Sequence, residues 1–201
     1  MWRESHVYLS ALSSPLGALV TVHGLIELER SMNRFAHLVR AIVGQQLSTR
    51  AAAIISGRVL AAVGGNLTAS TIGSIPEETL HDCGLSTAKL RSVKDLAQKV
   101  RDGFLDLEEI DQFADDEIVN RLVEVRGIGV WTAQMFLIFA LNRPDVLPLG
   151  DLGIQNGVAR LYGLENRPSP SDVSLVAKDG LWHPYATVAC LHLWRSLSTA
   201  G

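Results

Sequence analysis

Apolar residues recur at helical spacing along almost the whole chain of 201 residues, which constrains the fold more than any other feature. In one such cluster, Phe35, Val39 and Ile42 lie four and three residues apart, as on one face of an amphipathic helix. Ser48 and Ser86 each precede a further cluster, where a side chain can cap the first turn. Alternation typical of strands is scarce. We therefore predict an all-α fold of two helical lobes with a cleft between them.

The expected domain organisation is a single unit of two lobes, approximately residues 31–110 and 111–201, with the N-terminal segment packing on the second lobe. Two segments depart from the helical pattern. Alternation over Leu16–Val22 indicates a short strand, and Pro168 and Pro170 indicate a loop.

Composition excludes several classes of protein. Hydrophobic residues make up 47% of the chain, which excludes global disorder. A net charge of −3 argues against an unselective nucleic-acid coat protein, so DNA binding must be argued from a motif. Two cysteines are too few for a disulfide framework, and the six histidines lack metal-ligand spacing.

The N-terminus lacks a signal-peptide pattern, and the longest apolar stretch, Met135–Leu141, is too short to cross a bilayer. We expect a cytoplasmic monomer without membrane contact, associated with the nucleoid if bacterial and nuclear if eukaryotic.

The most informative segment is Leu122–Asp151, in which two helical patterns flank the turn Gly127-Ile128-Gly129. Amides in the first turn of the second helix have no partner within that helix, so they can bind a DNA phosphate. A Gly-x-Gly turn alone also suits an ordinary corner between two helices, and that interpretation stays open at this point.

The surrounding residues resemble the helix-hairpin-helix DNA glycosylase superfamily, in particular the 3-methyladenine DNA glycosylase II, alkylation-repair branch. The resemblance rests on the run Val125–Ala133, on Asp151 located 22 residues after Gly129, on GQQLS at Gly44–Ser48, and on Trp182–Trp194. It extends over roughly Ser31–Arg195.

The resemblance implies that Asp151 is the catalytic carboxylate. A carboxylate beside the sugar stabilises the oxocarbenium-like transition state in which the glycosidic bond breaks, and it can direct the attacking water. The simpler interpretation is that Asp151 only caps the helix that it precedes.

The resemblance also implies a pocket for the flipped base, formed by Trp131, Trp194 and Met135. Indole faces attract the positively charged ring of an alkylated purine. The alternative is that the tryptophans are ordinary core aromatics, as we expect for Trp182. Some relatives have a tyrosine where Met135 stands, which implies a roomier and less polar pocket here.

Further site residues follow from the resemblance. Gln46 is the candidate wedge that fills the stack behind the flipped base. The implied DNA contacts as a whole are Gln45, Gln46, Ser48, Gly127, Gly129, Val130 and Thr132. Backbone carbonyls of Val123, Val125 and Ile128 are implied ligands of a structural Na⁺ or K⁺, and no other cofactor is expected.

Two departures from the family pattern bear on the site. Arg126 replaces the usual hairpin proline, and Ala186 replaces an arginine that usually follows Pro-Tyr. In lyase members a lysine stands two places after the second hairpin glycine, where this chain has Trp131. No lysine occurs between Val100 and Ala177, so release of the base without strand cleavage is expected.

The sequence therefore predicts a monofunctional glycosylase that flips alkylated bases, such as 3-methyladenine or 7-methylguanine, out of duplex DNA and excises them by hydrolysis. The alternatives are a non-catalytic helix-hairpin-helix module that binds DNA structures, and an all-α protein-interaction domain. A carboxylate at Asp151 is needed only by the first.

Overall fold

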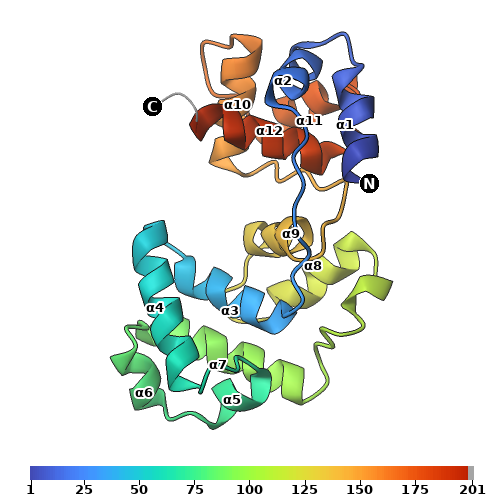
Figure 1. The fold of residues 1–201 in the computed structure, drawn as a ribbon. Helices are drawn as coiled ribbons and strands as arrows, with labels where there is room; N and C mark the ends of the chain where they lie inside the picture. Colours follow the sequence, from blue (N-terminus) through green and yellow to red (C-terminus); the bar gives the residue numbers. More distant parts are fainter. Residues whose placement is uncertain (199–201) are drawn as a thin grey trace. The chain divides into compact units, whose positions relative to one another are not determined.

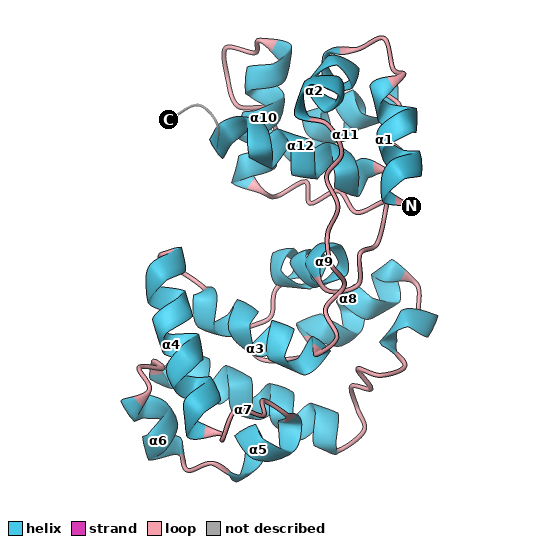
Figure 2. Cartoon of the chain, in the orientation of Figure 1, coloured by secondary structure: helices cyan, strands magenta, loops and turns pink. Residues whose placement is uncertain are grey.

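The structure is a computed structural model that describes residues 1–198, and this range consists of helices and connecting loops (Figures 1 and 2). The all-α prediction is confirmed for these residues. The chain forms two compact units: an inserted unit, residues 31–136, and a terminal unit, which combines residues 1–30 with those from 137 onward.

The inserted unit is built around α7, against which α3, α5 and α6 pack. Helix α4 follows α3 and packs on it, so the loop between these two helices lies at one end of the pair. The helices are α3 (Arg34–Gly44), α4 (Thr49–Ala62), α5 (Ala69–Ser74), α6 (Glu77–Asp82), α7 (Thr87–Arg101), the short 3₁₀ helix Ile110–Gln112, and α8 (Asp115–Val123).

Helix α9 (Val130–Phe139) follows α8 after a tight turn, and its residues up to Phe136 belong to the inserted unit. The terminal unit contains α1 (Trp2–Ser10), α2 (Pro15–His23), α10 (Leu152–Tyr162), α11 (Pro170–Asp179) and α12 (Ala186–Ser198).

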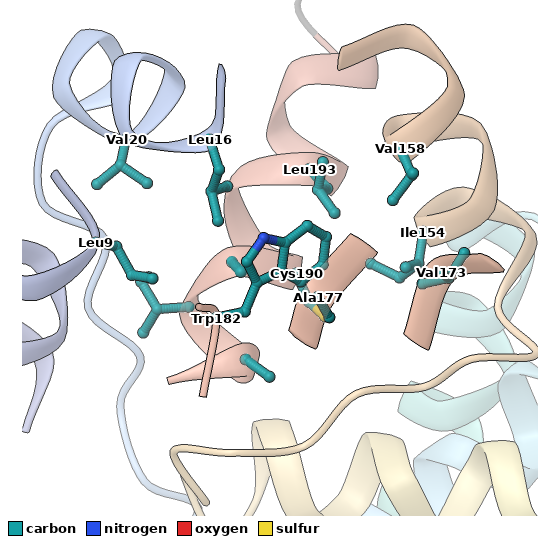
Figure 3. Close-up of a cluster of buried hydrophobic side chains, with 13 residues drawn as sticks. Leu9, Leu16, Val20, Ile154, Val158, Val173, Ala177, Trp182, Cys190 and Leu193 are labelled. Carbon is teal, nitrogen blue, oxygen red and sulfur yellow. The ribbon is translucent and has the colours of Figure 1, made fainter. Parts of the chain in front are cut away.

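Helix α12 is the centre of the terminal unit, because α1, α2 and α10 all pack against it. Trp182 is fully buried within the core of this unit, so it is the packing residue that its sequence context predicts. Figure 3 shows its indole between two groups of side chains, Leu9, Leu16 and Val20 from α1 and α2, and Ile154, Val158 and Val173 from α10 and α11.

Most helix starts follow from local chemistry. Ser48 and Ser86 accept hydrogen bonds from the amides of Ala51 and Lys89, as the sequence predicts for caps of α4 and α7.

Two local predictions are wrong. Leu16–Val22 lies in α2, not in a strand, since Ser14 caps that helix, Pro15 occupies its first position, and Leu16 and Val20 are buried one turn apart. Pro170 begins α11 instead of lying in a loop, because Ser169 and Asp172 form a capping box around it.

The division between the units also differs from the predicted boundary near residue 110. The inserted unit continues to residue 136 because the hairpin after α8 is bonded to α7 and to the α3–α4 loop. Within residues 1–198, no helix combines the length and apolar character that crossing a membrane requires.

Candidate active site

The turn between α8 and α9 is fixed by its first glycine. Gly127 has φ +77°, a conformation that favours glycine, and a Cβ there would lie 2.4 Å from Oγ of Ser92 on α7. The amide of Ile128 donates to the carbonyl of Val125 at 3.0 Å, which closes the turn. The backbone conformation and the close approach of Ser92 therefore both favour glycine at position 127.

Gly129 is placed differently. A Cβ on this residue would meet no described atom within 4 Å, and its carbonyl accepts from the amide of Ala133 at 3.0 Å, so it begins α9 without a capping side chain. Val130 and Trp131 follow on the surface of the inserted unit, each about half exposed at 55% and 50%. The exposure of Trp131 is inconsistent with an ordinary core aromatic.

The loop between α3 and α4 lies against the hairpin. Gln45 donates from Nε2 to the carbonyl of Gly127 at 2.8 Å, and this bond brings together two segments that the sequence predicts as DNA contacts. Gln46 is exposed and has φ +58°, a sparsely populated conformation for glutamine. Ser48 caps α4, so its hydroxyl has a structural role.

Side chains of helix α7 bond to both the α3–α4 loop and the hairpin. Lys89 donates from Nζ to the carbonyls of Val43 and Gln45, both at 2.7 Å, and burial lowers the pKa of this lysine. Asp95, two turns later on α7, accepts from the amide of Arg126 in the hairpin at 2.8 Å. Neither Lys89 nor Asp95 belongs to a recognisable motif, so the sequence alone does not identify them.

In the terminal unit, Asp151 follows the loop after α9 and is the N-cap of α10, as its position predicts. Its Oδ1 accepts from the amide of Ile154 at 2.8 Å, and the residue is only 9% exposed. Two further bonds hold the end of the loop: the Asp151 amide donates to the carbonyl of Pro148, and Gln155 donates from Nε2 to the carbonyl of Leu149, both at 2.9 Å.

Trp194 on α12 is part of the same arrangement. Its Nε1 donates to Oδ1 of Asp151 at 3.0 Å, and its ring stacks on Phe139 with centroids 5.8 Å apart. Gly153 leaves room for this contact, because a Cβ there would lie 2.9 Å from Cδ1 of Trp194 and 3.0 Å from Oδ1 of Asp151. The indole therefore orients the carboxylate directly.

Cys190 on α12 is fully buried in the same unit. Burial, followed by the negative charges of Asp151 and Asp145, raises the pKa of its thiol far above the usual range, so Cys190 stays neutral.

The remaining predicted site residues are spread over the hairpin and α9. Thr132 is buried and Met135 is half buried, both on α9. Of the three carbonyls implied as cation ligands, that of Val125 accepts the hydrogen bond that closes the turn, Val123 is the last residue of α8, and Ile128 is in the turn itself. Trp131 and Met135 belong to the inserted unit, whereas Asp151 and Trp194 belong to the terminal unit.

A family model for base excision DNA repair proteins of the HhH-GPD superfamily matches residues 39–181, a range that includes the hairpin and Asp151. The chain belongs to this superfamily of helix-hairpin-helix repair proteins.

Individual relatives cover nearly the whole chain. DNA-3-methyladenine glycosylase 1 of Schizosaccharomyces pombe is 32% identical over 98% of this chain and 88% of its own length. A structure of the 3-methyladenine DNA glycosylase of that yeast with abasic DNA has a TM-score of 0.86, with 98% of each chain covered. A DNA-3-methyladenine glycosidase from Bacillus halodurans is 35% identical with a TM-score of 0.85, covering 95% of this chain and 88% of its own. The resemblance to the alkylation-repair branch is confirmed.

Proposed function

We propose that this chain is a monofunctional DNA glycosylase that flips alkylated bases out of duplex DNA and releases them by hydrolysis, with Asp151 as the catalytic carboxylate. The observation that carries the proposal is the nearly buried Asp151 carboxylate, held by a backbone amide and by the Trp194 indole. The names of the relatives, which act on 3-methyladenine, support the class of substrate.

The chemistry needs a negative charge beside the sugar. As the glycosidic bond breaks, positive charge develops at C1′ and on the ring oxygen, and a fixed carboxylate stabilises it without reorganising. Asp151 also directs the water that attacks C1′, so that the sugar gains a hydroxyl and the base leaves. The two hydrogen bonds to Oδ1 limit the orientations that the carboxylate can adopt.

The inserted unit supplies the DNA-binding strip, which consists of the α3–α4 loop (Gln45–Ser48) and the start of α9 (Gly129–Thr132). Amides at the start of α9 bind a phosphate, and Gly129 lets the DNA backbone approach closely. Gln46, exposed and held in an unusual conformation, fills the space left by the extruded base.

In this proposal the residues that recognise the flipped base are Trp131 and Met135 in the inserted unit and Trp194 in the terminal unit. Half-exposed Trp131 offers an indole face on which a cationic alkylated purine can stack. Carbonyls of Val123, Val125 and Ile128 would hold a structural Na⁺ or K⁺, which suits the tight hairpin because each carbonyl oxygen has a second lone pair available.

The central test is a panel of duplexes with single lesions, in which released base is measured by mass spectrometry. Wild-type chain should release alkylated purines. In Asp151→Asn the release rate should fall ~10²–10³-fold, the equivalent of ~3–4 kcal/mol of charge stabilisation, while DNA binding persists. Asp172→Asn, which changes an exposed carboxylate of the α11 capping box, is the matched control and should keep its activity. Normal turnover by Asp151→Asn would exclude Asp151 from the mechanism, whereas DNA binding without any base release by the wild-type chain would favour a binding module.

Release without strand cleavage is tested separately. A lyase attacks the sugar with an amine, whereas Trp131 stands where lyase relatives have a lysine. Borohydride reduction during the reaction should trap no protein–DNA adduct. A strong trapped band that persists after the N-terminal amine is blocked would show that an amine and not water is the nucleophile.

A further inference from the structure

The loop that leads from α9 to Asp151 is fastened to α12 through one buried side chain, Thr187. Its hydroxyl donates to the carbonyl of Arg143 at 2.6 Å and accepts from the amide of Val146 at 2.9 Å. Its own amide donates to the carbonyl of Pro144 at 3.1 Å. Thr187 is fully buried, so water cannot replace these bonds without opening the core.

The same side of α12 reaches the carboxylate. Trp194 lies seven residues, or about two turns, after Thr187, so both side chains project from one face of the helix. Cys190 lies between them on that face, with its thiol 3.9 Å from the carbonyl of Val146. Thus Thr187 holds the backbone of the loop, and Trp194 holds Oδ1 of the residue at which the loop ends.

The remainder of the loop has little freedom once Thr187 is in place. Four residues separate Val146 from Asp151, and two bonds within this stretch involve the carbonyls of Pro148 and Leu149. A shift of the loop at Val146 would therefore be transmitted to the backbone of Asp151, while the indole of Trp194 stays with α12.

We propose that Thr187 is a positioning residue for base excision, which sets the place of the Asp151 carboxylate through the loop backbone. This inference rests on the proposed function of Asp151. Its physical basis is that a carboxylate stabilises a developing cation only from a fixed place, so that a misplacement of about 1 Å can cost about 100-fold in rate.

The decisive variant is Thr187→Val, which keeps the shape of the side chain and removes the hydroxyl. Thr187→Ser restores the hydroxyl, and Val20→Ala lowers stability from the core of the same unit without removing a hydrogen bond to the loop. For each variant we would measure the single-turnover rate of base release at saturating DNA, the Kd for lesion duplex, and the Tm.

The expected result is a rate reduced about 10- to 100-fold in Thr187→Val, with the Kd within about twofold of wild type. Thr187→Ser should return most of the rate, and Val20→Ala should keep its rate at a temperature well below its Tm. This pattern separates positioning from a general loss of stability, because only positioning affects the rate without the Kd and responds to the returned hydroxyl.

Three results would overturn the inference. One is a wild-type rate of base release in Thr187→Val while Asp151→Asn is inactive. In that case the positioning role of Thr187 is refuted, and the proposed function of Asp151 still stands. The second is a loss of rate in Thr187→Val that Thr187→Ser does not reverse. The third comes from the unmodified chain, and so does not depend on a variant that folds: the amide of Val146 should be protected from hydrogen exchange, and exchange at an unprotected rate would show that the bond to Thr187 does not hold the loop.

Discussion

Each unit has one helix that supports its part of the site, and the two helices do this with different chemistry. In the inserted unit, α7 presents Lys89, Ser92 and Asp95, of which the two charged side chains bond to backbone groups of the DNA-binding strip and the adjoining hairpin. In the terminal unit, α12 presents Thr187, Cys190 and Trp194, which are uncharged and bond to the loop and side chain of Asp151.

The difference fits the tasks that we propose for the two regions. A DNA-binding strip tolerates a lysine among its supports, since a positive charge near phosphates favours binding. A carboxylate that must stabilise a cation is different, because an adjacent lysine or arginine would offset its charge. The Trp194 indole is a neutral donor, so its hydrogen bond to Oδ1 of Asp151 fixes the carboxylate without adding a positive charge.

The largest predicted effect is a loss of stability in acid, which we assign to a histidine of the terminal unit. His192, buried in the terminal unit, faces His23 with their Nδ1 atoms 3.2 Å apart. Burial, His23, His6 and Arg195 lower the pKa of His192 to about 4, and burial also lowers that of His23. The unfolded chain then binds more protons than the folded chain between about pH 4 and pH 6.5.

The free energy of unfolding should therefore fall as the pH falls from about 6.5 to about 4, by up to about 3 kcal/mol, and be insensitive to His192 above that range. Urea unfolding at several pH values measures it. His192→Gln should lose most of this dependence, whereas His81→Gln, an exposed site in α6, should keep it. If the free energy of unfolding depended equally on pH in wild type and in His192→Gln, His192 would not be the group that destabilises the chain in acid.

The next largest effect should come from Gly153→Ala, which tests the neutral support of Asp151. The new methyl group overlaps the Trp194 indole and Oδ1 of Asp151, so the hydrogen bond between them must lengthen or break. We expect the single-turnover rate to fall about 10- to 100-fold while the Kd for DNA changes little.

Gly57→Ala is the control for Gly153→Ala, since a Cβ at Gly57 in α4 would meet no described atom. If Gly153→Ala excised bases at the wild-type rate, the contact between Trp194 and Asp151 would have no part in catalysis.

Lys89→Met tests the charged support of the inserted unit, and Lys94→Met provides a close match on the same helix. Lys94 donates to the carbonyls of Gly73 and Ile75 at the end of α5, in the way that Lys89 donates to those of Val43 and Gln45. Each substitution should cost about 2 kcal/mol of stability, because hydrogen bonds from a charged group are lost.

Only Lys89→Met should also weaken DNA binding, about tenfold (about 1.4 kcal/mol), because it alone loosens the Gln45–Ser48 loop. A fluorescence anisotropy titration measures this effect. Equal affinities of the two variants would mean that α7 does not organise the DNA-binding strip.

The smallest effects separate the two hairpin glycines. Gly127→Ala should lower the free energy of unfolding by about 1–2 kcal/mol, because alanine resists a positive φ and meets Ser92. Gly129→Ala should leave stability within about 0.5 kcal/mol, because a Cβ there meets nothing within 4 Å, and should weaken DNA binding a few-fold if a phosphate approaches this residue as we propose. Thermal unfolding and anisotropy distinguish the two, and a stability loss in Gly129→Ala equal to that in Gly127→Ala would contradict this division of roles.

Local features of the fold could be predicted from the sequence. Capping by Ser48, Ser86 and Asp151 depends on side chains three residues from their partners, and the positive φ of Gly127 is one that glycine adopts readily. The segment Leu16–Val22 shows where the hydrophobic pattern is ambiguous, because a run that is nearly all apolar fits both the helical and the strand periodicity. There the Ser14-Pro15 helix start decides the outcome.

The supports of the site could not be predicted. Thr187 looks like an ordinary helical threonine, and it matters because folding brings it to residues about 40 positions earlier. From the sequence alone, Gly153 is a residue that weakens α10. The structure shows that its lack of a side chain leaves room for Trp194, 41 residues later. At Ala186, which stands where the family usually has an arginine, Asp145 accepts hydrogen bonds from the backbone amide and from the His183 ring.

The composition of the terminal unit from both ends of the chain has a consequence for synthesis on the ribosome. Tyr8 bonds to the carbonyl of His183, 175 residues later, and the apolar faces of α1 and α2 are covered by α12. Synthesis proceeds at about 5–20 residues per second, so α12 is completed roughly 10–30 s after α1 and α2. The contiguous residues 31–136 can already fold during that interval. A nascent chain that stalls before Thr187 carries a finished inserted unit, exposed leucines at its N-terminus, and an Asp151 that nothing yet holds in place.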